Sequence, residues 1–293
     1  PVRTIIFHME PWCPNPDQNW GIKTWNEWAK PDPGQFLQVR SHDKYINNCL
    51  WQFSLTYSDL KQTNFVHQKT KGNKISSICS SKYFDPGHIR RIDFIKFIEQ
   101  KNDPFVQIDI YNHDNIRNFK GYVGPHPPGK KELGMINYKY YFMGENNKET
   151  NFITEKIWEP LITETLCFYW GCPNISEHID PRTYIVLDLN DFEKSFETIK
   201  NAIMNGEWEK RIDYIRSEKQ KVLEYYNFYP TLERVLCHDY RLTNSLSNEE
   251  VIYRKYFNHL LDKKVETVCF FHNCMLGRGP SIFIEYIKRF YSS

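Results

Sequence analysis

The chain has 293 residues, and its 38 Lys and Arg nearly balance its 36 Asp and Glu. This length suffices for two domains, or one large one, that bury a core without disulfide or metal staples. A net charge of +2 argues against a nucleic-acid binder, and no apolar run reaches the roughly 18 residues of a membrane span. Aromatic residues make up 16% of the chain. They suit thick cores and stacking surfaces for sugars or bases, but a biased gene composition would explain them equally.

The first half of the chain contains short predicted elements separated by loops. Apolar runs predict three strands, over residues 4–10, 75–79 and 106–111. The first of these ends at Glu10 and precedes a proline-rich loop, whereas Ile92, Ile95 and Ile98 follow a helical spacing that predicts a helix over 88–100. Glycines and prolines gather over residues 121–134, which predicts a linker between two lobes.

The second half has a regular pattern. The predicted strands cover residues 138–143, 165–170 and 183–189, and the predicted helices cover 153–161, 192–203, 207–226 and 230–262. Asn190 with Glu193 predicts a cap for the second of these helices. Strands alternating with helices in this way predict an α/β fold, in which a parallel sheet carries helices on both faces.

We therefore expect three parts. Residues 1–125 would form an acceptor-side lobe, residues 126–262 a donor-binding lobe, and residues 263–293 a further βα unit. That unit, with a strand over 265–271 and a helix over 281–290, would pack on the N-terminal lobe or begin another domain.

The eight cysteines contain no Cys-x-x-Cys pair and lack flanking histidine pairs. This spacing does not fit a zinc site, so we expect mostly free thiols and no metal centre. Pro1 is not an initiator residue, so we expect a chain that was processed or cut from a longer one. A cytoplasmic location is favoured, or the secretory pathway if an anchor was removed.

Three polar residues stand where chemistry is expected. Glu145 ends a predicted strand, and Glu155 with Lys156 opens the next helix. Ligands of open parallel sheets bind at the carboxyl ends of the strands, where a helix N-terminus suits a pyrophosphate. Lys156 would add a positive charge, and Glu155 would accept hydrogen bonds from sugar hydroxyls. The alternative is an exposed Glu–Lys pair on a helix surface.

The order and spacing of several motifs resemble one enzyme family. The motifs are Gly144-Glu145-Asn146, Phe152-Ile153-Thr154-Glu155-Lys156, Tyr169-Trp170-Gly171-Cys172-Pro173, Ser80-Ser81 with Arg91, and Phe7-His8-Met9-Glu10-Pro11. Together they are similar to the motifs of the α-1,3/4-fucosyltransferases, the family-ten glycosyltransferases.

The resemblance implies a GT-B-like fold of two facing Rossmann-like lobes with the donor site in the cleft, here with an abbreviated N-terminal lobe. It implies inverting transfer of fucose from GDP-fucose to a hydroxyl of a glycan or glycoconjugate acceptor. Glu10 would be the general base, Arg91 and Lys156 would neutralise the diphosphate, and Asn146 and Glu155 would bind donor hydroxyls. Glu145 and Phe152 would complete the donor site. No cofactor beyond the donor is implied, and since Arg and Lys supply the charge a metal is not obligatory.

The chain departs from the family pattern at three positions. Phe152 replaces a tyrosine, Gly144 replaces a phenylalanine, and Pro160 falls inside a predicted helix. These departures keep two alternatives open: another nucleotide-sugar donor on the same fold, or a carbohydrate-binding or scaffolding domain without turnover. Four tryptophans lie close together in the first part of the chain: Trp12, Trp20, Trp25 and Trp28. They would either stack on the acceptor sugar or belong to the core. Asp188, Asn190 and Asp191 resemble the metal-binding Asp-x-Asp of other transferases, but helix capping explains them better.

Overall fold

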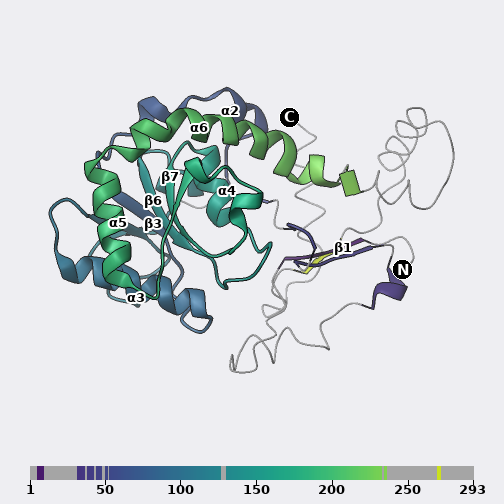
Figure 1. Cartoon of the computed structure of the whole chain (residues 1–293), viewed down its shortest axis with the longest axis horizontal. Coiled ribbons are helices and arrows are strands. Elements are labelled where there is room, and N and C mark those ends of the chain that lie inside the picture. The colour runs from purple at the N-terminus through teal and green to yellow at the C-terminus, as the bar shows by residue number, and fades with distance from the viewer. Residues whose placement is uncertain are drawn as a thin grey trace.

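The computed structural model describes residues 5–9, 32–36, 38–42, 44–47, 50–51, 53–126, 130–232, 234–235 and 269–271. These residues form two parallel β-sheets (Figure 1). The larger has six strands in the order β5-β4-β3-β6-β7-β8, and the smaller has three in the order β2-β1-β9.

The elements have the following bounds. The strands are β1 (Ile5–His8), β2 (Gln38–Arg40), β3 (Ile75–Ile78), β4 (Ile108–Tyr111), β5 (Tyr122–Gly124), β6 (Tyr140–Gly144), β7 (Leu166–Trp170), β8 (Tyr184–Val186) and β9 (Cys269–Phe271). The α-helices are α2 (Tyr57–Gln62), α3 (Pro86–Lys101), α4 (Glu155–Ile162), α5 (Phe192–Met204) and α6 (Glu207–Lys221), and a π-helical turn (Val222–Tyr226) continues α6. Short 3-10 turns cover Pro33–Gln35, Phe65–Gln68, Lys131–Gly134, Ile175–Glu177 and Pro181–Thr183.

The larger sheet lies between two layers of helices. Helices α3 and α5 contact each other on one face, while α4 and α6 pack together on the other (Figure 1). Every residue of β6 and β7 is buried, as expected for central strands of a parallel sheet covered on both sides. The α/β fold with helices on both faces is thus confirmed.

The predicted boundary at residue 125 is corrected by the strand order. β3 pairs with β6 in parallel register, Ile75 opposite Tyr140, so strands from both sides of the proposed linker share one sheet. Gly121 and Pro125 instead flank the short edge strand β5, which pairs with β4. Helix α3, with Arg91, therefore belongs to the same unit as α4, with Lys156.

The smaller sheet is built around β1. β1 pairs in parallel with β2 on one side and with β9 on the other, Ile6 lying opposite Cys269. The predicted strands over 4–10 and 265–271 thus form at Ile5–His8 and Cys269–Phe271 and pair with each other. The predicted helix over 281–290 lies outside the described residues, and the assignment of 263–293 as a separate unit stays a prediction.

The start of α5 differs from the prediction in one detail. The N-cap is Asp191, whose side chain accepts a hydrogen bond from the Lys194 amide, and not Asn190. Asn190 instead donates to Asp188 Oδ1 through its backbone and side-chain nitrogens, at 3.1 and 2.9 Å. Both aspartates therefore have local structural partners, as helix capping requires.

Two findings concern cysteines and membranes. In the described part of the chain, Cys79, Cys167 and Cys172 are buried free thiols. Within the same residues, no helix combines the length and apolar content that a bilayer crossing requires.

A buried ion pair fastens α6 to the end of the larger sheet where β7 begins. Glu164 Oε1 lies 2.9 Å from Lys219 Nζ, and both side chains are almost fully buried. Glu164 also accepts the Phe65 amide through Oε2, and its backbone carbonyl accepts the Trp208 indole N–H. One acidic residue thus joins the segment before β3, the α4–β7 turn and α6.

We expect the Lys219→Ala substitution to lower the free energy of unfolding by about 3 kcal/mol, because it leaves the buried Glu164 carboxylate without its closest cation. Urea unfolding would measure the loss. Lys61→Ala is the matched control, since Lys61 pairs with Glu224 at the solvent-exposed surface and its loss should change the free energy of unfolding far less. Equal effects of the two substitutions would contradict the role given to Glu164.

Candidate functional site

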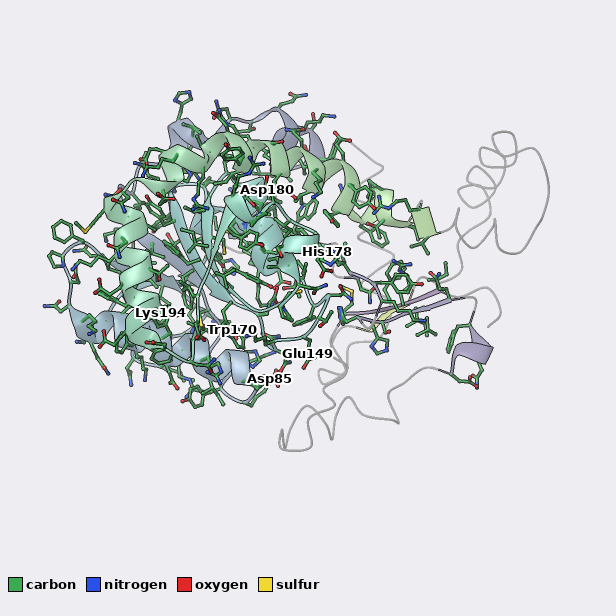
Figure 2. The ribbon with its side chains drawn as sticks, in the orientation of Figure 1. Asp85, Glu149, Trp170, His178, Asp180 and Lys194 are labelled. Atoms are coloured by element: carbon green, nitrogen blue, oxygen red, sulfur yellow. The ribbon has the colours of Figure 1, made fainter. Side chains whose placement is uncertain are left out.

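Two helices begin at the carboxyl edge of the larger sheet. Asp85 is the N-cap of α3, which opens with a proline in its first turn, and Thr154 is the N-cap of α4. The free backbone N–H groups and the positive dipole ends of both helices therefore lie at this edge. In Figure 2, Glu149 in the loop between β6 and α4 lies on the side of this unit that is turned toward β1.

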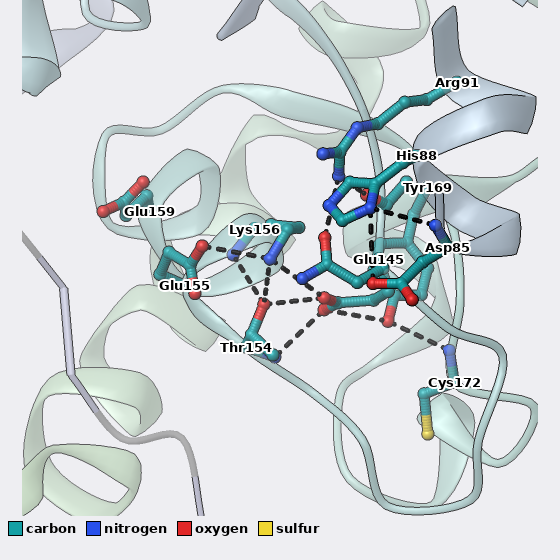
Figure 3. A network of polar contacts seen from close by, with 12 residues as sticks. Asp85, His88, Arg91, Glu145, Thr154, Glu155, Lys156, Glu159, Tyr169 and Cys172 are labelled. Carbon is teal, nitrogen blue, oxygen red and sulfur yellow. Dashed lines mark hydrogen bonds and ion pairs between the residues drawn. The ribbon is translucent and has the colours of Figure 1, made fainter. Parts of the chain in front are cut away.

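Glu145 follows β6 and is a fully buried carboxylate (Figure 3). Its Oε1 accepts the Thr154 backbone N–H at 3.0 Å, and its Oε2 accepts the Thr154 hydroxyl at 2.7 Å. Lys156 Nζ lies 3.4 Å from Oε2. Burial raises the pKa of the carboxyl, which Lys156 opposes. Glu145 was expected to bind the donor, but in this conformation it has no exposed surface and holds the start of α4 in place.

The neighbouring strand makes room for this carboxylate. The Tyr169 hydroxyl lies 3.4 Å from Glu145 Oε1 and accepts the Cys172 amide at 3.1 Å. A Cβ at Gly171 would lie 2.4 Å from Glu145 Cγ, so only glycine fits there. Glu145 can therefore occupy this position only because Tyr169 and Gly171, at the end of β7, leave room for its side chain.

Lys156 occupies the second position of α4 and is surrounded by oxygen atoms. Its ammonium donates to the Thr154 hydroxyl and to Glu155 Oε1, both at 3.1 Å. Glu155 is one-third exposed. Burial disfavours ionisation of Glu155, but Lys156 and Lys131 outweigh it and lower the pKa of the carboxyl to about 2. The Glu155–Lys156 pair is therefore an ionised pair at the helix N-terminus, with Lys156 largely buried.

Arg91 and Asn146 meet across the gap between α3 and β6. Arg91 Nη1 donates to Asn146 Oδ1 and to the Gly144 carbonyl, both at 3.1 Å, and Nη2 donates to Ser80 at 3.2 Å. Asn146 is partly exposed, whereas Arg91 is buried. The structure thus brings four expected site residues, Arg91, Asn146, Glu155 and Lys156, to one edge of the sheet.

Phe152 is buried and contacts the segment that follows β2 of the smaller sheet. Its ring packs edge-to-face on His42, with centroids 5.0 Å apart. The preceding Asn151 donates to the His42 carbonyl at 2.9 Å. Phe152 was expected to line the donor site, and here it anchors the loop that leads to Thr154.

The remaining candidates divide into placed and undescribed residues. Glu10, the expected base, lies outside the described residues, two positions after the end of β1. The four tryptophans at 12, 20, 25 and 28 also lie outside them. A Cβ at Gly144 would lie 3.5 Å from the Trp170 ring. In the described ranges, no group of three or more His, Cys, Asp or Glu is arranged to hold a metal ion.

Asp85 and His88 belong to the site but were not singled out from the sequence. Burial and the cations Arg91, Lys156 and Lys82 lower the pKa of His88 to about 2, and burial raises the pKa of Asp85 to about 6. Positive charge therefore converges on this point of the sheet edge, where an anion would be stabilised. The Asp-Pro pair at 85–86 is a helix-start signal that could have located both residues.

We expect the Glu145→Gln substitution to lower the free energy of unfolding by about 2 kcal/mol, because an amide donor would then face Lys156 and the Thr154 hydroxyl. Chemical denaturation measures this loss, and hydrogen exchange should accelerate at residues 152–156. Glu149→Gln, in the same loop but partly exposed, is the control and should change neither quantity. Unchanged exchange at 152–156 in Glu145→Gln would contradict the anchoring role.

Comparisons with known proteins find similarity in the same part of the chain. Residues 67–207 match the model of glycosyltransferase family 10 (fucosyltransferase), C-terminal part. The chain is 29% identical over 87 residues to an alpha-(1,3)-fucosyltransferase, FucT, of Helicobacter pylori, a match that covers 29% of this chain and 17% of that protein. One similar solved structure is an alpha1,3-fucosyltransferase with GDP-fucose, at 19% identity and a TM-score of 0.38, and the match covers 53% of this chain and 48% of that chain. Another is the pneumococcal O-GlcNAc transferase GtfA in complex with UDP and GlcNAc, at 12% identity and a TM-score of 0.43, and the match covers 83% of this chain and 46% of that chain. The chain thus spans less than half of each of these relatives. Residues 67–207, which contain β3 to β8 and the polar residues at their carboxyl edge, are thus similar to the C-terminal part of glycosyltransferase family 10 (fucosyltransferase).

Proposed function

We propose that the chain transfers fucose from GDP-fucose to a hydroxyl group of a glycan or glycoconjugate, with inversion at the sugar carbon. The observation that carries this proposal is that Arg91, in the second turn of α3, and Lys156, in the first turn of α4, lie at the same edge of the sheet, in a segment that matches the family-10 model. Both cations are held by fixed oxygen acceptors, so their positions do not depend on a ligand.

The donor half of the reaction needs positive charge where the diphosphate leaves. Negative charge develops on the diphosphate as the bond to the sugar breaks, and preorganised cations stabilise it. Arg91 and Lys156 supply that charge, so the proposal requires no metal. Glu155, ionised and one-third exposed, and Asn146, partly exposed, would bind hydroxyls of the donor.

The acceptor half needs one base opposite the leaving group. In an inverting displacement this base takes the proton of the attacking hydroxyl. We assign this step to Glu10, which follows β1 in the chain. Position 152 favours one alternative, in which the chain uses another nucleotide-sugar donor. Phe152 lacks the hydroxyl group of the tyrosine that stands at this position in the family pattern.

We expect GDP and GDP-fucose to raise the thermal midpoint, while UDP, UDP-glucose and UDP-galactose leave it unchanged. A nucleotide at about 100 times its Kd stabilises the folded state by roughly 2.7 kcal/mol, which a melting scan detects easily. GDP-mannose serves to separate base recognition from sugar recognition. A shift with uridine compounds alone would reject GDP-fucose, and Lys156→Ala, as the matched variant, should bind GDP more weakly.

We expect Glu10→Gln to abolish fucose transfer and to leave GDP binding nearly unchanged, because the amide cannot accept the proton while the donor half stays intact. Transfer is measured with radiolabelled GDP-fucose and a panel of glycans, and GDP binding by calorimetry. Transfer by Glu10→Gln at the rate of the unmodified chain would show that another group is the base.

A further inference from the structure

Ser80 lies where the chain connections of the larger sheet diverge. It comes two residues after β3, and β3 is the neighbour of β6 in the sheet. From β3 the chain passes through α3 to β4 on one side, and from β6 it passes through α4 to β7 on the other side. Ligands of open α/β sheets bind at such a point, outside the carboxyl ends of the strands. The fold therefore places Ser80 where a donor nucleotide is expected.

The Ser80 hydroxyl is the exposed member of the contacts that hold Arg91. Arg91 reaches from α3 toward the residues that follow β6 (Figure 3). Its Nη2 donates to Ser80 Oγ at 3.2 Å, whereas Nη1 donates to the Gly144 carbonyl and to Asn146 Oδ1. Only 3% of Arg91 is exposed, but Ser80 is an exposed residue. A ligand at this edge therefore meets the Ser80 hydroxyl more readily than the buried guanidinium.

The Ser80 hydroxyl also has a proton to donate. A serine hydroxyl can accept hydrogen bonds and donate one of its own. Arg91 occupies the accepting side, and no acceptor for the Ser80 O–H is found among the residues that the structure describes. A hydrogen bond received from a guanidinium polarises the hydroxyl, which makes its O–H a stronger donor. An anionic oxygen is the acceptor that such a donor binds best.

The turn that carries this hydroxyl is fixed from the side of β4. The next residue, Ser81, accepts two hydrogen bonds from Arg117 at its carbonyl, at 2.9 and 2.7 Å. The Ser81 hydroxyl donates to Asp114 Oδ1 at 2.8 Å and accepts the Asn112 side-chain amide at 3.1 Å. Of two adjacent serines, one thus has its hydroxyl bound within the protein and holds the backbone, and the other presents its O–H at the edge of the sheet.

Resting on the proposed function, we propose that Ser80 is a further donor-binding residue, whose hydroxyl donates a hydrogen bond to the diphosphate of the bound nucleotide. Arg91 donates to Ser80 Oγ at the same time, so the buried guanidinium acts on the diphosphate in part through this hydroxyl. The contact strengthens as negative charge develops on the departing diphosphate.

The experiment measures the Kd of GDP by calorimetry for the full chain and three variants. Ser80→Ala should raise the Kd about tenfold, the effect of one hydrogen bond to a charged group. Ser80→Thr keeps a hydroxyl and should stay within about threefold of the unmodified chain. Ser58→Ala is the matched control and should leave the Kd unchanged, since Ser58 is an exposed serine of α2 that accepts a hydrogen bond from the neutral Gln62 side chain.

The variants should melt at nearly the same temperature as the unmodified chain, because Ser80 and Ser58 are exposed. A change in Kd then reports on the contact with the ligand. A Kd in Ser80→Ala within about twofold of the unmodified chain would overturn the inference. A loss in Ser80→Thr as large as that in Ser80→Ala would overturn it as well, because the hydroxyl would then not be the group that matters.

Failure of this inference is distinguishable from failure of the proposed function. GDP and UDP share the diphosphate, so a chain that binds UDP and not GDP would reject GDP-fucose as the donor, and the variants would be compared with UDP. The same loss of about tenfold in Ser80→Ala would then be expected. Binding of neither nucleotide by the unmodified chain would overturn both proposals, whereas GDP binding that Ser80→Ala leaves unchanged would overturn the role of Ser80 alone.

Discussion

The site depends on one fully buried carboxylate. Glu145 accepts hydrogen bonds from the backbone amide and the hydroxyl of Thr154, and its carboxylate lies beside the Lys156 ammonium. These contacts fix where α4 begins and where the Lys156 ammonium lies. A buried carboxylate without such partners would be strongly unfavourable, so these contacts stabilise the arrangement of residues 145–156. Tyr169 and Gly171 on the neighbouring strand complete the pocket, which ties the position of Lys156 to the pairing of β6 with β7. The register between β6 and β7 therefore determines where the Lys156 ammonium lies.

Much of the fold could be predicted because the central strands are uniformly apolar and the helices have apolar stripes. The four residues that meet at the sheet edge were predicted from motifs whose order matches a known family. The role of Glu145 could not be predicted, because an acidic residue after a strand reads as exposed until the neighbouring Gly171 and Tyr169 are seen to enclose it. The boundary at residue 125 was wrong for a related reason. Glycine and proline mark a break in regular structure, but only the pairing of β3 with β6 shows that the chain returns to the same sheet.

One departure from the family pattern has a packing explanation. Gly144 ends β6 where the family carries a large aromatic residue, and here the Trp170 ring of the next strand lies within van der Waals distance of the position a Cβ would take. Arg90 lies over the same indole, 5.9 Å from its centroid. An aromatic side chain therefore covers the end of β6 although it comes from β7. The departure at Phe152 is of another kind, because that ring packs on His42, which follows β2 of the smaller sheet.

The contact between Phe152 and His42 separates two functions of one loop. Its first part, through Asn151 and Phe152, meets a segment that follows β2 of the smaller sheet. Its last part, Thr154, is fixed to Glu145 inside the larger sheet. A displacement of the smaller sheet would therefore act first on residues 151–152, while Lys156 would keep its place. The position of Lys156 thus depends on the larger sheet and not on the segment that follows β2. Such fixed placement is what the proposed role of Lys156 needs, because preorganised cations stabilise charge that develops on a leaving group.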